Sequence, residues 1–318
     1  MFAARCIGVS LAVFVLLYVS LSLGVSRGWR LMLRMFRPES ARGSADSLFV
    51  LRILPLALSS VVTLVFTLPS FLLLEPRSTD EAIGRAPLAL GCSCLILVGV
   101  GIARAAMAQW RASRALVQWL NGSTRMESQV TESGEAVPIF RTGNVGPSVT
   151  VAGLCAPKVL VSEAALALLN PPELRTALRH EIAHARHYDN LKKLMFRFSV
   201  FPAMADLEHA WSEEAEMAAD DAAVSSFQDA LHLAAALIKV SRLGTMEASG
   251  ELTMALLHSS TALSARVRRL VTWKTAQKLQ NGRWFYRLLA AGAVAIAMVT
   301  TYSSALTQMH ALTEWLVR

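Results

Sequence analysis

Four long apolar runs divide the chain, three of them before residue 110 and one near its end. They cover about Cys6–Val25, Ile53–Leu74, Pro87–Ala106 and Leu288–Leu306. A helix needs about 20 apolar residues to cross a hydrocarbon core of about 30 Å, so each run predicts a transmembrane helix. The first run could instead be a signal peptide, but it exceeds the usual apolar region of about 7–15 residues and no clear small-x-small cleavage site follows it.

The long segment between the third and fourth runs has the pattern of a domain outside the membrane. Short β-like pieces at Val137–Arg141, Ser148–Leu154 and Lys158–Ser162 are separated by glycine and proline, which predicts a small sheet. An edge of such a sheet can accept an extended peptide as a further strand. The equally weighted alternative is that these strands only cover a neighbouring helix.

Helical patterns follow the predicted strands. Asn170 as N-cap, Pro171 at the first helical position and Glu173 three residues after the cap predict a well-defined helix start. The apolar run Leu194–Ala205 is interrupted by Arg197 and by a proline, so it is too short and broken for a span. It predicts a buried or membrane-grazing helix.

Composition agrees with a membrane protein. The chain is 54% hydrophobic and 17% charged, against about 45–50% and about 25% in soluble domains. Its cysteines match neither a disulfide framework nor a zinc knuckle; they are Cys6, Cys92, Cys94 and Cys155. The net charge of +8 comes largely from basic residues at the edges of apolar runs, so we expect anionic lipid headgroups, and not nucleic acid, as the partner.

The basic residues also predict the topology. Ser26–Ser47 contains five arginines, which predicts a cytoplasmic loop that lies along the membrane interface. Arg52 can snorkel toward the same side. The acidic loop Glu75–Ala86 then lies outside, and the basic and aromatic stretch Arg283–Arg287 lies before the fourth run on the cytoplasmic side. This predicts three domains: residues 1–106 with three spans, a cytosolic domain at 107–283, and 284–318 with the fourth span and an external tail.

The chemistry is concentrated in residues 180–189, His-Glu-Ile-Ala-His-Ala-Arg-His-Tyr-Asp. His180 and His184 are one helical turn apart, so both imidazoles can reach one zinc ion. Glu181 then lies beside the open coordination position where a water binds. The alternative is an exposed helix that carries this pattern by chance.

A second acidic helix start can complete the site. Ser212 is a plausible N-cap, and Glu216 and Asp220 share one helix face. Such a stretch alone is most often a solvated helix start. Downstream of His-Glu-x-x-His, however, Glu216 can supply the third zinc ligand and Asp220 can orient a ligand imidazole from behind.

These motifs together resemble the BlaR/MecR-type membrane metallopeptidases. The resemblance rests on the His180–His184 helix followed by Asp189, on Glu216-Met-Ala-Ala-Asp220, on Pro157-Lys-Val-Leu-Val-Ser162 and on Ala265-Arg-Val-Arg-Arg-Leu270. It implies an α-helical membrane protein of four transmembrane helices with an α+β zincin-like (gluzincin) cytosolic peptidase domain, located in a bacterial-type inner membrane.

The resemblance also assigns roles. It implies that one Zn²⁺ ion is held by His180, His184 and Glu216, that Glu181 is the general base, and that Asp220 supports a ligand. The activity it implies is a zinc-dependent endopeptidase that cleaves a cytosolic protein, such as a winged-helix transcriptional repressor, after a signal reaches the membrane helices.

Two departures keep alternatives open. Ala219 stands where the BlaR/MecR type often has cysteine, which favours the related HtpX-type quality-control proteases, although those usually have two spans on each side of the catalytic helix. The chain shows no Ser-x-x-Lys and ends twelve residues after Leu306, so we expect no penicillin-binding sensor. A third alternative is a catalytically idle membrane adaptor that retains the zinc site.

The residue that stabilises the oxyanion is not evident from the sequence. His187, Tyr188 and His209 are near the motif, but each is better explained as a packing or surface residue. Asp189 is expected to close the motif helix and not to act in catalysis.

Overall fold

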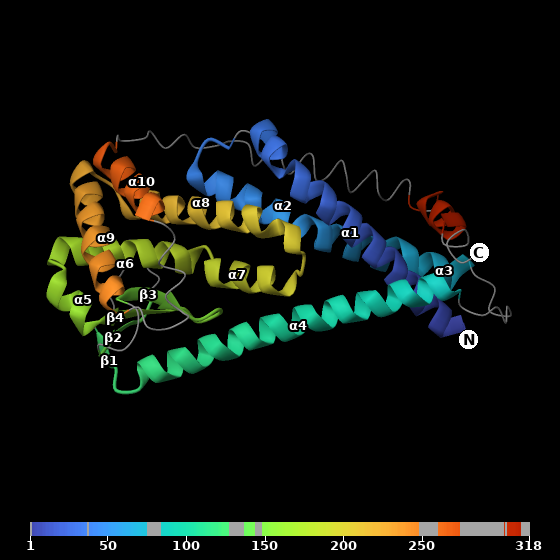
Figure 1. Ribbon diagram of the computed structural model, residues 1–318, viewed down its shortest axis with the longest axis horizontal. Coiled ribbons are helices and arrows are strands. Elements are labelled where there is room, and N and C mark those ends of the chain that lie inside the picture. The colour runs from blue at the N-terminus through green and yellow to red at the C-terminus, as the bar shows by residue number, and fades with distance from the viewer. Residues whose placement is uncertain are drawn as a thin grey trace.

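The computed structural model describes residues 2–36, 38–74, 84–126, 137–143, 148–247, 260–273, 302 and 304–312. Figure 1 shows an elongated molecule with long helices at one end and a domain of shorter helices and a small sheet at the other. The amino terminus lies at the helical end, far from the sheet.

Three long helical segments are apolar enough to cross a membrane. They are α1 (Phe2–Phe36), the run from α2 (Ala41–Val62) through a π-helical turn (Thr63–Thr67) into α3 (Leu68–Leu74), and α4 (Arg85–Leu120). Each contains one of the first three predicted runs, which identifies a membrane protein by helix length and composition. The fourth predicted span, Leu288–Leu306, lies outside the described residues except for its last few positions, and most of the Glu75–Ala86 loop is also outside them.

The interface loop predicted at Ser26–Ser47 is wrong, because most of the stretch is helical: α1 continues to Phe36 and α2 begins at Ala41. Ser40 caps α2, and its hydroxyl accepts the Gly43 amide at 3.1 Å. The stretch is helical because its apolar residues recur on one helix face and pack into a buried cluster. These residues are Val25, Trp29, Met32 and Leu33. The arginines between them make this periodicity hard to recognise in the sequence.

The third helix also exceeds its predicted span. Its 36 residues correspond to about 54 Å, well beyond a hydrocarbon core of about 30 Å. The expected domain boundary at residue 106 therefore falls inside a continuous helix, which carries the chain directly to the sheet.

The sheet has four strands in the order β1-β2-β4-β3. β2 (Ile139–Thr142), β3 (Val149–Ala152) and β4 (Lys158–Ser162) confirm the three predicted pieces, whereas the three-residue β1 (Thr124–Met126) was too short to be predicted. β2 and β4 are parallel, and β3 pairs with β4 antiparallel, which leaves β3 at an edge of the sheet.

Six helices complete the described part of the domain. They are α5 (Glu163–Leu168), α6 (Pro171–Arg186), α7 (Asp189–Phe198), α8 (Ala205–Ala223), α9 (Phe227–Glu247) and α10 (Ser260–Val271). The predicted start of α6 is confirmed: Asn170 Oδ1 accepts the Glu173 amide and Glu173 Oε2 accepts the Asn170 amide, each at 2.9 Å. Leu178 and Ile182 on α6 pack against Val159 and Val161 of the sheet.

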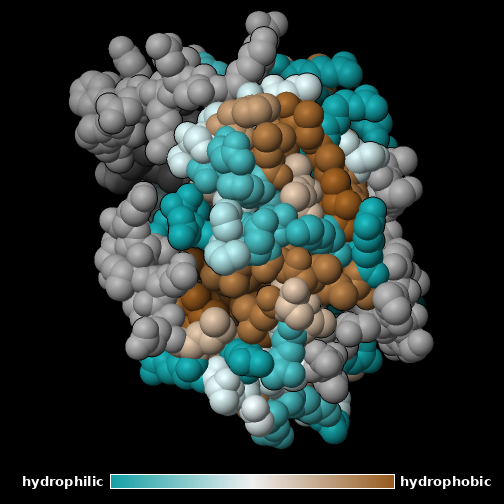
Figure 2. Space-filling model, turned by 90° about the vertical axis from the view of Figure 1, so that its left-hand side faces the viewer, coloured by the Kyte–Doolittle hydropathy of each residue, from teal (hydrophilic) through white to brown (hydrophobic). Residues whose placement is uncertain are grey.

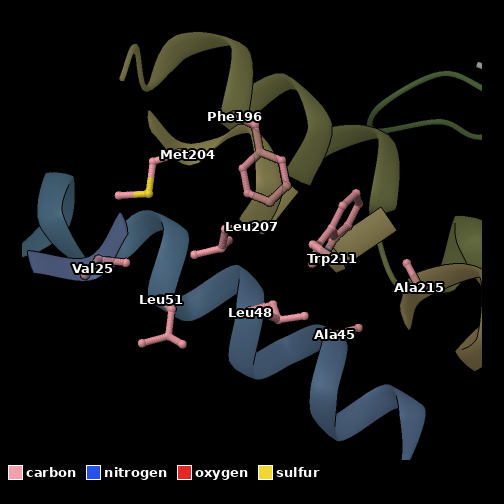
Figure 3. Close-up of a cluster of buried hydrophobic side chains, with 9 residues drawn as sticks. All are labelled: Val25, Ala45, Leu48, Leu51, Phe196, Met204, Leu207, Trp211 and Ala215. Carbon is pink, nitrogen blue, oxygen red and sulfur yellow. The ribbon is translucent and has the colours of Figure 1, made fainter. Parts of the chain in front are cut away.

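The domain packs directly on the membrane helices (Figure 3). Val25 of α1 and Leu48 and Leu51 of α2 meet Phe196 of α7 and Trp211 of α8 in one buried cluster. Arg52 lies beside this cluster, and the prediction that it snorkels outward is wrong, because its side chain is buried. The first three turns of α2 therefore belong to the domain's core as well as to a candidate span.

The surfaces of the two ends differ. Exposed leucine, isoleucine and valine side chains are frequent on α1 to α4, as expected for helices that face lipid. Figure 2 views the molecule from the domain end and shows a band of hydrophobic residues across this face with hydrophilic residues around it.

Candidate metal centre

Helix α6 carries the two histidines of the motif. It is held between the sheet on one side and α8 and α9 on the other. The side chains of His180 and His184 are buried, and their Nε2 atoms lie 3.2 Å apart with the rings nearly perpendicular. As the i, i+4 spacing predicted, both nitrogens reach the same point.

Glu216 of α8 approaches that point from the facing helix. Its Oε2 lies 3.4 Å from His180 Nε2 and its Oε1 lies 3.5 Å from His184 Nε2. Two imidazole nitrogens and a carboxylate therefore converge from two helices that are about 30 residues apart in sequence. Among the described residues this is the group of histidine, cysteine and acidic side chains suited to hold a metal ion.

The spacing of these atoms fits a metal. Ligands bound tetrahedrally at about 2.0–2.1 Å lie about 3.3 Å from one another. The observed separations of 3.2, 3.4 and 3.5 Å are close to that value. Three protein ligands of this kind leave a fourth position for water, which is the arrangement of a catalytic site and not of a closed structural one.

Each histidine is held from behind by an aspartate. His184 Nδ1 donates to Asp189 Oδ2 at 2.7 Å, and His180 Nδ1 lies 3.0 Å from Asp220 Oδ1. These contacts orient both rings with Nε2 toward the metal position. The role predicted for Asp220 agrees with this placement, whereas Asp189, expected only to close the helix, contacts His184.

A sharp turn brings Asp189 back to His184. Tyr188, between α6 and α7, is in the left-handed region with φ of 53°. This reverses the chain, so that the first residue of α7 points back at α6. Arg42 and Lys192, at 3.8 and 3.7 Å, hold the other oxygen of Asp189. The pairing of His184 with Asp189 depends on this turn. The spacing of five residues between them does not predict it.

Arg266 of α10 is a further part of the centre. Its Nε and Nη2 donate to the two oxygens of Asp220 at 2.8 and 2.6 Å, and its Nη1 lies 2.9 Å from Glu216 Oε2. One guanidinium therefore holds both the ligand carboxylate and the carboxylate that supports His180. The sequence showed Arg266 only as one of several basic residues in a helix, without a role.

Glu181 points from α6 toward the sheet edge. Its Oε2 accepts the Val151 amide of β3 at 2.9 Å. The Val151 carbonyl accepts from Asn190 Nδ2 at 3.2 Å, so both backbone groups of Val151 face away from β4. The expected general base and the open edge of the sheet are thus in direct contact.

The centre is electrostatically coupled. Burial alone lowers the pKa of His184, but its bonds to Asp189 and Glu216 outweigh burial and raise that pKa to about 10. The pKa of His180 is raised by Asp220 and Glu216 in the same way. Burial raises the pKa of Glu216, but His180, His184 and Arg266 outweigh it and hold that pKa well below its usual value. A metal that binds must therefore displace protons from the imidazoles.

The remaining candidates are peripheral. Tyr188 is exposed on the turn, and His187 forms the carboxyl-terminal cap of α6. His209 lies on the exposed side of α8, 3.4 Å from Glu213. None of these contacts connects them with the three ligand atoms.

Part of the domain matches a known family. Residues 150–248, from β3 to just beyond α9, match the model of peptidase family M48. No match was found among curated proteins. Peptidases of this family are metallopeptidases, and the matched segment contains His180, His184 and Glu216 with the aspartates that hold the two imidazoles. The molecule is thus a membrane protein that carries a metallopeptidase-type domain.

Proposed function

We propose that this protein is a membrane-embedded, zinc-dependent endopeptidase. The observation that carries the proposal is the convergence of His180, His184 and Glu216 at tetrahedral spacing, with Glu181 of the same motif helix bonded to the edge strand β3. The donor set of two imidazoles and one carboxylate is typical of catalytic zinc. The match to peptidase family M48 supports the same reaction class.

The side chains have distinct tasks in peptide hydrolysis. A zinc ion held by His180, His184 and Glu216 would lower the pKa of a water to about 7 and would polarise the scissile carbonyl. Glu181 accepts the proton of that water and passes it to the leaving amine. Asp189 and Asp220 keep the two imidazoles oriented, and Arg266 fixes Glu216 through an oxygen at 2.9 Å.

The substrate binds along β3. This strand is at the edge of the sheet, and Val151 turns its amide and carbonyl toward Glu181 and Asn190. An extended peptide can pair with such an edge as an additional strand. Pairing there brings a backbone carbonyl of the peptide next to Glu181, which explains why the base and the edge strand are in contact.

The domain faces the cytosol and cuts a cytosolic protein. The ends of α1 and α4 nearest the domain carry most of the arginines of these helices, including Arg27, Arg30, Arg111 and Arg114, and positive residues favour the cytoplasmic side. Three candidate spans precede the domain, as in the BlaR/MecR type, whereas the HtpX type has two. A signalling protease that cleaves a repressor is therefore favoured over quality control.

Glu181→Gln tests the proposal, with Glu213→Gln on the exposed side of α8 as the matched control. In purified protein we expect both variants to retain one zinc ion per chain, measured by elemental analysis, and only Glu181→Gln to lose cleavage. Sequencing the new amino termini in cells with wild-type and Glu181→Gln protein then identifies the substrate. Equal cleavage by both, or absence of stoichiometric metal in the wild type, refutes the proposal.

A further inference from the structure

All three long membrane helices converge on one short segment, Phe198–Val200, which we call the connector because it joins α7 to α8. From α1, Tyr18 Oη donates to the Val200 carbonyl at 3.0 Å. From α2, Arg52 Nη1 donates to Ser199 Oγ at 2.8 Å, and Nη2 donates to the Ser199 carbonyl. From α4, Gly101 lies so close to the Phe198 carbonyl that no Cβ fits between them.

These contacts are buried. Tyr18 is 1% exposed, and Arg52 and Ser199 are each 2% exposed. Tyr18 and Gly101 also lie within the first and third apolar runs, so the connector reaches the level of the membrane spans. A buried guanidinium is tolerated only when its donors are satisfied. Arg52 meets this condition through Ser199 and through Glu208 of α8, which accepts from its Nε at 2.8 Å.

The connector lies between the two halves of the metal centre. Helix α7 begins at Asp189, which holds His184, and ends at the connector. Helix α8 follows the connector and carries Glu216 and Asp220. Glu208, bonded to Arg52, is eight residues before Glu216, or about 12 Å along the same helix. Phe196 and Trp211 pack edge to face across α7 and α8 at 5.0 Å between ring centroids.

We propose that Arg52 and Tyr18 are positioning residues for the metal centre. By fixing the connector and Glu208, they set the placement of α7 and α8 on α6, and so the distance between Glu216 and the two histidines. A rearrangement of α1, α2 and α4 that releases the connector separates these ligands. The membrane helices thereby control the peptidase activity proposed above, on which this regulatory part of the inference rests.

The test measures Zn²⁺ affinity of the full chain in detergent, by competition with a fluorescent chelator. The variants are Arg52→Met, Arg52→Lys and Tyr18→Phe. Arg30→Met is the matched control, because Arg30 also reaches from a membrane helix to α8, but its 3.9 Å pair with Asp206 is exposed. Circular dichroism establishes that each variant is folded at the temperature of the titration.

We expect Arg52→Met to weaken zinc binding about tenfold or more, the range seen when support of metal ligands is lost. Arg52→Lys should recover part of the loss, since it retains the charge but not the forked donors. Tyr18→Phe, which keeps the ring and its packing, should give a smaller loss, and Arg30→Met none. If Arg52→Met does not fold, Tyr18→Phe decides the question.

Unchanged zinc affinity in folded Arg52→Met, or in folded Tyr18→Phe where Arg52→Met does not fold, overturns the inference. A purely structural role would lower the melting temperature and leave zinc affinity intact. The two proposals fail separately. If zinc affinity falls in the Arg52 variants but the wild type cleaves nothing, only the peptidase assignment fails. If cleavage requires Glu181 but zinc affinity is unchanged in the Arg52 variants, only the positioning role fails.

Discussion

Replacing Arg266 gives a quantitative test of how the metal centre is held together. Asp220 is completely buried, and Arg266 provides two of its hydrogen bonds, at 2.8 and 2.6 Å. In Arg266→Met the carboxylate keeps only its contact with His180. Removing one partner of a buried ion pair costs about 3–5 kcal/mol, because an unpaired charge remains. For a protein of this size, this corresponds to a fall in melting temperature on the order of 10 °C.

Arg269→Met is the matched control on the same helix. Arg269 also joins α10 to α8, through Asp221, but both side chains are more than a third exposed. Exposed ion pairs contribute about 0–1 kcal/mol, so this variant should unfold within a few degrees of the wild type. The assay is tryptophan fluorescence during heating of the metal-free protein in detergent. Equal shifts in the two variants would refute the reasoning, since burial of the pair would then be irrelevant.

Three further predictions follow from the site. The pKa of His184 is raised to about 10 in the folded protein. In the metal-free protein, the stabilisation from protonated His184 is therefore fully present below about pH 6.5 and is lost as the pH rises to about 10. The melting temperature measured against pH checks this, and bound zinc should abolish the pH dependence. Asp189→Asn should weaken zinc binding about 10–100-fold, measured by chelator competition, and Asp206→Asn, at an exposed position of α8, should leave it unchanged. Val151→Pro removes the amide that holds Glu181 and should lower kcat for a peptide substrate while the zinc content stays constant.

Much of the site could be predicted because its signals are local. The spacing of His180 and His184 is set by one helical turn, and the cap at Asn170 by the first turn of the same helix. Glu216 could be predicted from chemistry, since two imidazoles require a further ligand. The BlaR/MecR subtype and the zincin-like fold remain predictions.

What the sequence could not predict depends on contacts between distant elements. Arg266 and Asp220 are 46 residues apart, and Arg52 and Ser199 are 147 apart. A basic residue beside an apolar run has the same local pattern whether it reaches lipid headgroups or a buried carbonyl. The sequence therefore predicts Arg52 at the membrane surface, and the arginines of Ser26–Ser47 conceal the apolar face through which Trp29 packs on the buried cluster.

These contacts explain why the peptidase-type domain and the membrane helices should behave as one unit. A domain tied to the membrane by a flexible linker would have its own core, and movement of the spans would not reach its ligands. Here Leu48 and Leu51 of α2 complete the core that Trp211 of α8 occupies, five residues before Glu216. Since packed cores transmit displacement, we expect a shift of α2 to reach Glu216, the proposed third ligand, through this core and helix α8.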